Sequence, residues 1–198
     1  MKSKTTMTHR NPAPSRTRPS RRRGAAGFTL IEAALTTVIV GTGILAMVSA
    51  QQAYHIKNQW AARTGTGQML ANEIRELTLS MPHHDPITGS DNLGPEANEA
   101  SVADWDDLDD FAGTVSAERF GSGTTFNAPI NGLRLQIADL DQWQQVVRVE
   151  NVLPDNINNP TTVALGTTDM VRMTVVVQYQ PPGGAWETVT EMSWVVAE

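Results

Sequence analysis

The chain has 198 residues, 40% of them hydrophobic, no cysteine, and a formal net charge of −6. Without cysteine, a disulfide framework, a thiol nucleophile and a Cys-ligated zinc site are excluded. The charge is unevenly distributed. Eight of the 15 basic residues and none of the 21 acidic residues lie in the first 27 positions. The chain therefore joins a basic N-terminal segment to a strongly acidic remainder.

Residues 1–27 form the basic segment, which is rich in Arg, Ser, Thr and Pro. It has too few large apolar residues to offset the entropy of an ordered chain, so we expect a disordered leader. Basic arms of this kind can bind nucleic acid through phosphates. The apolar sequence that follows favours a membrane role instead, and the acidic remainder makes nucleic acid a poor direct partner.

Residues 28–53 are predicted to form a transmembrane helix. From Ala33 to Ile56 the chain carries no formal charge, which is long enough to cross a bilayer core of roughly 30 Å as a helix. The basic residues that precede this segment outnumber those that closely follow it, Lys57 and Arg63. The positive-inside rule then places the N-terminus in the cytoplasm and the C-terminal part outside. A buried helix of a soluble protein is the alternative.

Residues 54–81 continue the helical pattern as an amphipathic outer half. Its apolar residues recur at spacings typical of one helix face, which we expect to pack on a domain. They are Trp60, Gly67, Leu70, Ile74, Leu77 and Met81. The helix should end at Met81, before Pro82, and Gly65 and Gly67 should loosen or kink it. From Phe28 the predicted rod is about 80 Å long.

Residues 82–131 read as an irregular connecting region, with one or two helical turns around Trp105, Leu108 and Phe111. Residues 132–198 are predicted to form an antiparallel sheet of about four strands, packed on the outer half of the helix. The fold class is therefore α+β. The expected strands are Leu133–Ile137, Gln145–Val152, Met170–Gln180 and Trp186–Val196, the last two joined by a turn at Pro181–Gly184.

The sequence at the entrance to the apolar span is Gly27-Phe-Thr-Leu-Ile-Glu32. An ionised carboxylate at this place costs a few kcal/mol unless a charge pairs with it. Nothing nearby in the sequence offers that charge. The segment from Gly27 to Met47, behind a basic leader, resembles the class III signal of type IV pilins and type II secretion pseudopilins.

The resemblance implies specific processing and assembly. In that family a prepilin peptidase cleaves after the glycine, here Gly27, and the new N-terminal residue, here Phe28, becomes N-methylated. The glutamate at the fifth position after the cut, here Glu32, serves assembly and processing. The implied partners are the prepilin peptidase, other pilin or pseudopilin subunits, the inner membrane and an assembly platform protein.

Three departures favour a minor member of the family. The leader is long, the outer part of the apolar span lacks proline, and the cysteine pair of many major pilins is absent. We expect a pilin-like structural subunit, resembling PilV-like pilus modification proteins, that starts as a single-pass inner-membrane protein and enters a periplasmic or extracellular filament. A pilus, a secretion apparatus and a DNA-uptake system all remain open. The alternative function is an uncleaved, signal-anchored periplasmic binding module.

Three other patterns in the sequence are typical of binding or catalytic sites. Val40–Ala46 fits a G-x-G-x-x-A dinucleotide fingerprint, but no Asp or Glu lies between Glu32 and Glu73, so a Rossmann unit is not expected. His83, His84 and Asp85 are adjacent in a loop and are expected to be solvated. Ser, His and Asp occur without a G-x-S-x-G elbow, so no enzyme is predicted.

An acidic run, Asp104–Asp110, contains five aspartates that could chelate calcium, which takes oxygen ligands. It lacks the spacing and the terminal Glu of an EF-hand. We expect a solvated loop, with calcium binding as the open alternative, and predict no cofactor and no metal. The five tryptophans are expected to pack in the core and sheet.

Overall fold

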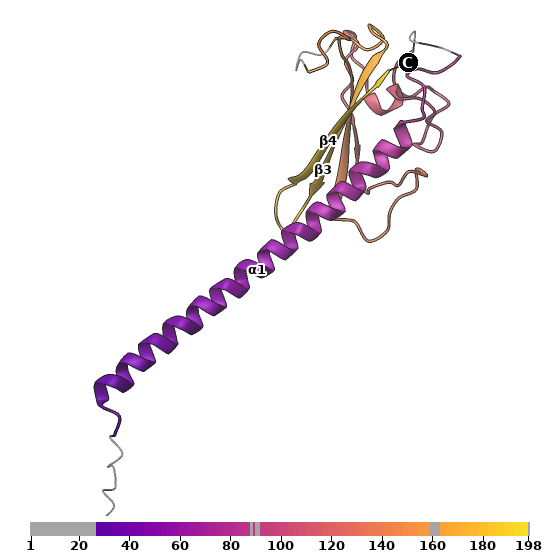
Figure 1. The fold of residues 1–198 in the computed structure, drawn as a ribbon. Coiled ribbons are helices and arrows are strands. Elements are labelled where there is room, and N and C mark those ends of the chain that lie inside the picture. The colour runs from indigo at the N-terminus through magenta and orange to yellow at the C-terminus, as the bar shows by residue number, and fades with distance from the viewer. Residues whose placement is uncertain (1–26, 88, 90–91, 159–162, 198) are drawn as a thin grey trace, which may run out of the picture. The chain divides into compact units, whose positions relative to one another are not determined.

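The computed structural model describes residues 27–87, 89, 92–158 and 163–197. Residues 1–26 of the expected leader lie outside this range. Within the described residues, the helices and strands follow one another as one long helix, the short 3-10 helix η2 (Asp109–Ala112) and four strands (Figure 1). Contacts within the chain define two compact units, one up to Ala50 and one from Gln51 to Glu198. The architecture confirms the α+β class.

Helix α1 spans Leu30–Thr78. Thr29 caps its N-terminus, because the Glu32 backbone N–H lies 3.3 Å from the Thr29 Oγ1. The helix ends three residues before the expected Met81. The Met81 N–H donates to the Thr78 carbonyl at 3.3 Å, a tighter turn than an α-helix makes. Pro82 also disfavours helical geometry at the residue before it. Gly65 and Gly67, which were expected to loosen or kink the helix, both lie within its continuous span.

The sheet has the order β1-β2-β3-β4, and every neighbouring pair is antiparallel. The strands are β1 (Thr124–Phe126), β2 (Trp143–Asn151), β3 (Met170–Tyr179) and β4 (Glu187–Ala197). The predicted hairpin is confirmed, because β3 pairs with β4 across the Pro181–Gly184 turn. Gly183 in this turn has φ +73°, a conformation that favours glycine.

The strand expected at Leu133–Ile137 is wrong. Arg134 has φ 65°, and Leu133 and Leu135 are exposed. The Asn131 Oδ1 accepts the N–H groups of Leu133 and Leu135 at 2.9 and 3.0 Å, so a side chain takes the donors that a sheet would use. The fourth strand is instead β1, in the segment expected to be irregular.

The core of the C-terminal unit lies between the sheet and the end of α1, which run side by side in Figure 1. Gly67, Leu70, Ile74 and Leu77 are buried, as the helix stripe predicted, and Met81 packs against the core. Trp60 departs from that prediction, because half of its surface is exposed. The expected turns around Phe111 form the 3-10 helix η2, Asp109–Ala112.

Buried Gln145 connects three parts of this unit. Its Nε2 donates to the Leu70 carbonyl of α1 at 2.8 Å and to the Ile130 carbonyl at 3.2 Å. Its Oε1 accepts the Ile130 N–H at 2.8 Å. The Glu73 Oε2 also accepts the Gly132 N–H at 2.7 Å. These bonds fix the irregular segment before β2 on the helix and explain why it does not join the sheet.

Candidate functional site

The residues of the Gly27–Glu32 segment lie at the start of α1. Gly27, Phe28 and Thr29 precede the first helical residue and have no regular secondary structure. Phe28 is 74% exposed, and a Cβ built on Gly27 would meet nothing within 4 Å. A non-helical, exposed peptide is accessible to a protease, so the geometry permits cleavage after Gly27.

Glu32 occupies the first turn of α1. Its backbone N–H bonds to Thr29, whereas its carboxylate has no hydrogen bond or ion pair within the part of the chain that the structure describes. The hydroxyl groups of the neighbouring threonines are satisfied. Thr36 donates to the Glu32 carbonyl at 2.7 Å and Thr37 to the Ala33 carbonyl at 2.9 Å. Such internal bonds suit a lipid environment, in which the Glu32 carboxylate would be a charge without a counter-charge in its own helix.

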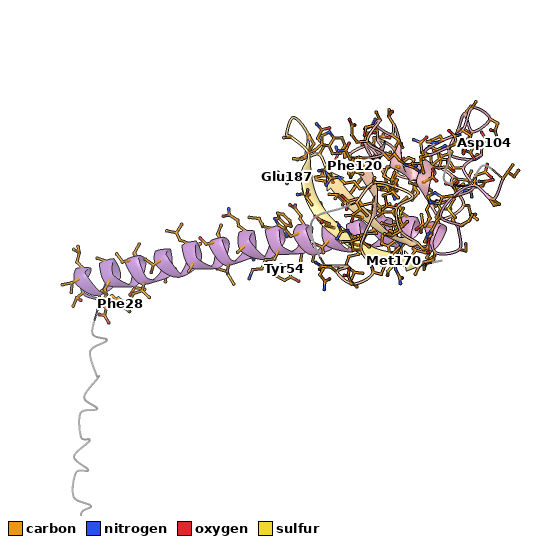
Figure 2. All side chains as sticks on the ribbon, turned by 90° about the horizontal axis from the view of Figure 1, so that it is seen from above. Phe28, Tyr54, Asp104, Phe120, Met170 and Glu187 are labelled. Carbon is orange, nitrogen blue, oxygen red and sulfur yellow. The ribbon has the colours of Figure 1, made fainter. Side chains whose placement is uncertain are left out.

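The apolar half of α1 exposes its side chains all round (Figure 2). By length and composition it can cross a membrane, and none of its most apolar window is buried. A core helix of a soluble protein would be mostly buried, so the exposure disfavours that alternative. Gly41 and Gly43 have open space beside them, which would admit a closely packed neighbouring helix.

The dinucleotide pattern lies in a helix, as expected, whereas the histidine pattern has different surroundings from those expected. Val40–Ala46 lies within α1, so the strand-to-helix turn of a dinucleotide site is missing. His83 is buried, and the His84 Nδ1 lies 2.6 Å from the Asp109 Oδ2, which corrects the expectation of a solvated loop. The residues His83, His84 and Asp85 do not form a group that could hold one ion among the described residues.

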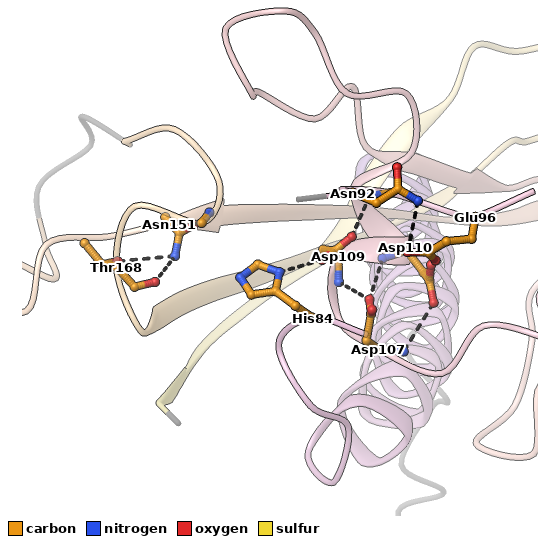
Figure 3. Close-up of polar contacts among 10 residues, drawn as sticks. His84, Asn92, Glu96, Asp107, Asp109, Asp110, Asn151 and Thr168 are labelled. Atoms are coloured by element: carbon orange, nitrogen blue, oxygen red, sulfur yellow. Dashed lines mark hydrogen bonds and ion pairs between the residues drawn. The ribbon is translucent and has the colours of Figure 1, made fainter. Parts of the chain in front are cut away.

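The acidic run is also not a solvated loop. Asp104 and Asp106 are exposed, but Asp107, Asp109 and Asp110 are buried at η2. Asp109 acts as a structural connector, because its Oδ1 accepts the Gly94 N–H and its Oδ2 contacts His84. Figure 3 shows Asp107, Asp109 and Asp110 close together with Glu96.

Asp107 and Asp110 each have one carboxylate oxygen that accepts hydrogen bonds from backbone N–H groups. The Asp107 Oδ1 accepts the N–H groups of Asp109 and Asp110 at 2.9 and 3.1 Å. The Asp110 Oδ2 accepts those of Asp106 and Asp107 at 2.9 and 3.2 Å. The second oxygens, Asp107 Oδ2 and Asp110 Oδ1, are buried and receive no hydrogen bond from a donor group among the described residues. The Asp110 carboxyl group lies within hydrogen-bond reach of the Glu99 carboxyl group, and such a bond needs a proton on one of them.

Two glutamates that the sequence analysis did not single out complete this carboxylate cluster. Carboxylate oxygens of Glu96, Asp107 and Asp110 lie within 4.8 Å of one another, as do those of Glu99, Asp106 and Asp110. Glu96 and Glu99 come from the preceding loop, where the Glu99 Oε2 accepts the Glu96 N–H at 2.9 Å. The sequence does not predict that Glu96 and Glu99 lie near the aspartates, because the loop has no periodicity that would place its side chains.

The environment disfavours negative charge at the cluster. Burial, together with the nearby charges of Asp109 and Asp110, raises the pKa of Asp107 to about 8. Burial also raises the pKa of Asp110 and of Glu99. Neither Asp107 nor Asp110 is in an ion pair with a basic side chain in the described part of the chain. These carboxylates therefore require protons or a cation.

Comparison with models of protein families, with curated proteins and with solved structures gave no match. Two sets of residues carry chemistry of their own. One is the Gly27–Glu32 signal with its exposed apolar helix, and the other is the buried carboxylate cluster. They lie in different units of the chain.

Proposed function

We propose that this protein is a structural minor pilin or pseudopilin subunit. A prepilin peptidase would cleave it after Gly27, and the subunit would then assemble into a type IV pilus or a type II secretion pseudopilus. The observation that carries the proposal is Glu32. This carboxylate stands in the first turn of an exposed apolar helix, at the fifth position after Gly27, without a partner among the described residues.

Cleavage would create the missing partner. A new amine at Phe28 carries a positive charge, and N-methylation leaves a secondary amine that still holds its proton. The amine of one subunit can then pair with the Glu32 carboxylate of a neighbour, and the pair sets the register between their helices. Small residues would allow close helix packing. They are Ala33, Ala34, Gly41, Gly43, Ala46 and Ala50.

The proposal gives the rest of the chain a location. Before assembly, the basic leader would lie in the cytoplasm, α1 would cross the inner membrane once, and the acidic C-terminal unit would lie in the periplasm. The processed subunit would leave the membrane for the filament. The function is structural rather than catalytic, with the peptidase, the assembly platform and other subunits as partners.

N-terminal mass spectrometry of the membrane-associated protein tests the proposal. We expect a mature chain that begins at Phe28 and carries one additional methyl group on its amine. Gly27→Leu should leave the full-length form, while Gly24→Leu, the same change three residues earlier in the leader, should still be processed. A wild-type chain that retains residues 1–27, or that is cut at another bond, would contradict the proposal.

The alternative is an uncleaved, signal-anchored periplasmic binding module. It shares the membrane helix and the topology but needs no cleavage and no neighbour for Glu32. The same measurement separates the two functions, since a chain with an intact leader in cells that contain an active prepilin peptidase would favour the anchored module.

A further inference from the structure

The buried carboxylate cluster contains more acceptor oxygens than its surroundings satisfy. Asp107 and Asp110 are 0% exposed, and each has one buried oxygen that receives no hydrogen bond from a donor group among the described residues. A buried polar group without a partner costs about 1–3 kcal/mol, and a charged one costs more. Two such oxygens at one place indicate that the folded protein binds something there.

The missing group cannot be an anion, so it is a cation or a proton shared between carboxyl groups. The same groups include carboxylates of Glu96, Glu99 and Asp106, which repel a further anion. The histidine nearest in the hydrogen-bond network, His84, contacts Asp109 instead. No basic side chain of the described residues pairs with the two oxygens, so a cation from outside the chain would complement them.

The spacing fits one metal ion. In each of the two groups the oxygens lie within 4.8 Å of one another. Oxygens bound to one Ca²⁺ at about 2.3–2.6 Å can be up to about 5 Å apart. All the donors are oxygens, which favours a hard cation and disfavours zinc or copper, because neither group includes histidine and the chain has no cysteine.

We propose that Glu96, Asp107 and Asp110 bind a calcium ion. The overlapping group of Glu99, Asp106 and Asp110 shares Asp110 and supplies further oxygens to the same site. Calcium suits this arrangement better than magnesium, because calcium takes six to eight oxygen ligands in a flexible geometry, whereas magnesium keeps its waters and demands an octahedron. The bound ion joins the loop that carries Glu96 to η2 and so orders the region between α1 and the sheet.

A shared proton is the competing arrangement. Protonation of Asp107 would place a carboxylic acid beside Asp110 or Glu96 and satisfy one of the open oxygens. Such a cluster would be stable without metal, and added calcium would leave its unfolding temperature unchanged. The two arrangements therefore differ in a property that can be measured directly.

The test uses the full chain, purified in detergent and freed of metal with EGTA. Calorimetric titration with CaCl₂ should give a Kd at or below about 1 mM, the range of extracellular calcium modules. At 100-fold excess over this Kd, calcium should raise the unfolding midpoint, followed by tryptophan fluorescence, by about 5–10 °C. The same concentration of MgCl₂ should raise it by less than half as much.

Asp107→Asn is the informative variant, because its amide oxygen can still accept the N–H groups of Asp109 and Asp110. We expect it to lose at least tenfold in calcium affinity and to lose the calcium-dependent rise in midpoint. Without calcium it should be about as stable as the wild type, since Asn is close in shape to the protonated Asp107 that the raised pKa favours. The matched control is Asp104→Asn, an exposed aspartate outside both groups, which should bind calcium normally.

Glu96→Gln provides a second variant from the other segment of the site, with the same expected loss of affinity. If Asp107→Asn does not fold, the result for Glu96→Gln decides. The proposal is overturned if the wild-type chain binds no calcium at 10 mM, if magnesium stabilises it equally, or if both Asp107→Asn and Glu96→Gln keep the wild-type affinity.

Discussion

Gly67 of α1 lies so close to Thr190 of β4 that a Cβ built on the glycine would be 2.8 Å from the Thr190 Oγ1 and 3.0 Å from the Val189 Cγ1. Real Cβ atoms essentially never approach other atoms below 3.0 Å. The glycine therefore determines how near the helix comes to the sheet. Gly67 therefore has a packing role that the sequence analysis did not foresee.

Gly67→Leu should destabilise the C-terminal unit by about 1–3 kcal/mol, because the added side chain must displace β4 or the helix. Chemical unfolding of the full chain in detergent, followed by tryptophan fluorescence, measures this change. Gly65→Leu is the matched control, since a Cβ at Gly65 meets nothing within 4 Å. It should cost nothing and can gain a few tenths of a kcal/mol from helix propensity. Equal effects of the two substitutions would show that α1 does not pack closely on β4 at Gly67.

Gln145 offers a test of the polar connection inside the core. Gln145→Leu keeps a similar side-chain volume but removes three hydrogen bonds. These are the bonds to the Leu70 carbonyl, to the Ile130 carbonyl and from the Ile130 N–H. The buried Ile130 N–H would lose its acceptor, so we expect a loss of about 1–3 kcal/mol in the free energy of unfolding. Gln68→Leu, at an exposed position of α1, should change stability by less than about 0.5 kcal/mol. A Gln145→Leu variant as stable as the wild type would show that the hydrogen bonds of Gln145 are not needed to hold the segment before β2.

The sequence predicted those elements whose residues repeat regularly. The helix stripe with Leu70 and Ile74 has the helical period, and the β3–β4 hairpin combines β-branched runs with a Pro-Pro-Gly-Gly turn. Leu133–Ile137 also alternates, but Asn131 captures its backbone donors. Local alternation cannot reveal that competition, and the three residues of β1 are too short to show a period.

The carboxylate cluster could likewise be predicted only in part from the sequence. The aspartates from Asp104 to Asp110 stand out in the sequence, but their burial depends on η2 packing into the core through Phe111. Glu96 and Glu99 join them through an irregular loop, and only the folded chain brings them together. By contrast, the Gly27–Glu32 signal is contiguous, so the sequence alone displays it.

The absence of native cysteine allows a clean test of membrane topology. A cysteine at exposed Ala117 should react with a membrane-impermeant maleimide added to spheroplasts. A cysteine at Ser15, in a Gly27→Leu background that retains the leader, should react only after the membrane is permeabilised. The physical reason is the basic leader, which the positive-inside rule keeps in the cytoplasm. Labelling of both positions in intact spheroplasts would exclude the proposed orientation.

Glu32 is the residue that distinguishes a filament subunit from a simple membrane anchor. Its carboxylate has no partner among the described residues, and a plain anchor would gain nothing from a charge in the first turn of its apolar helix. Glu32→Leu should insert into the membrane at least as well as the wild type, because it removes a charge from an apolar environment. It should also still be cleaved after Gly27, since the cut lies outside the helix.

The same variant should fail to enter the filament. The Phe28 amine of the neighbouring subunit would lose its counter-charge, and the helices would lose the polar contact that sets their register. Glu32→Gln should give an intermediate amount of incorporation, because its amide keeps a hydrogen bond but not the charge. Fractionation of sheared filaments, or cross-linking to other subunits, measures incorporation at equal membrane abundance. Thr36→Leu, one helical turn further along the same face, should assemble normally, since its hydroxyl bonds within its own helix. Normal assembly of Glu32→Leu would remove Glu32 as the contact between subunits and leave the cleavage site as the remaining support for a pilin.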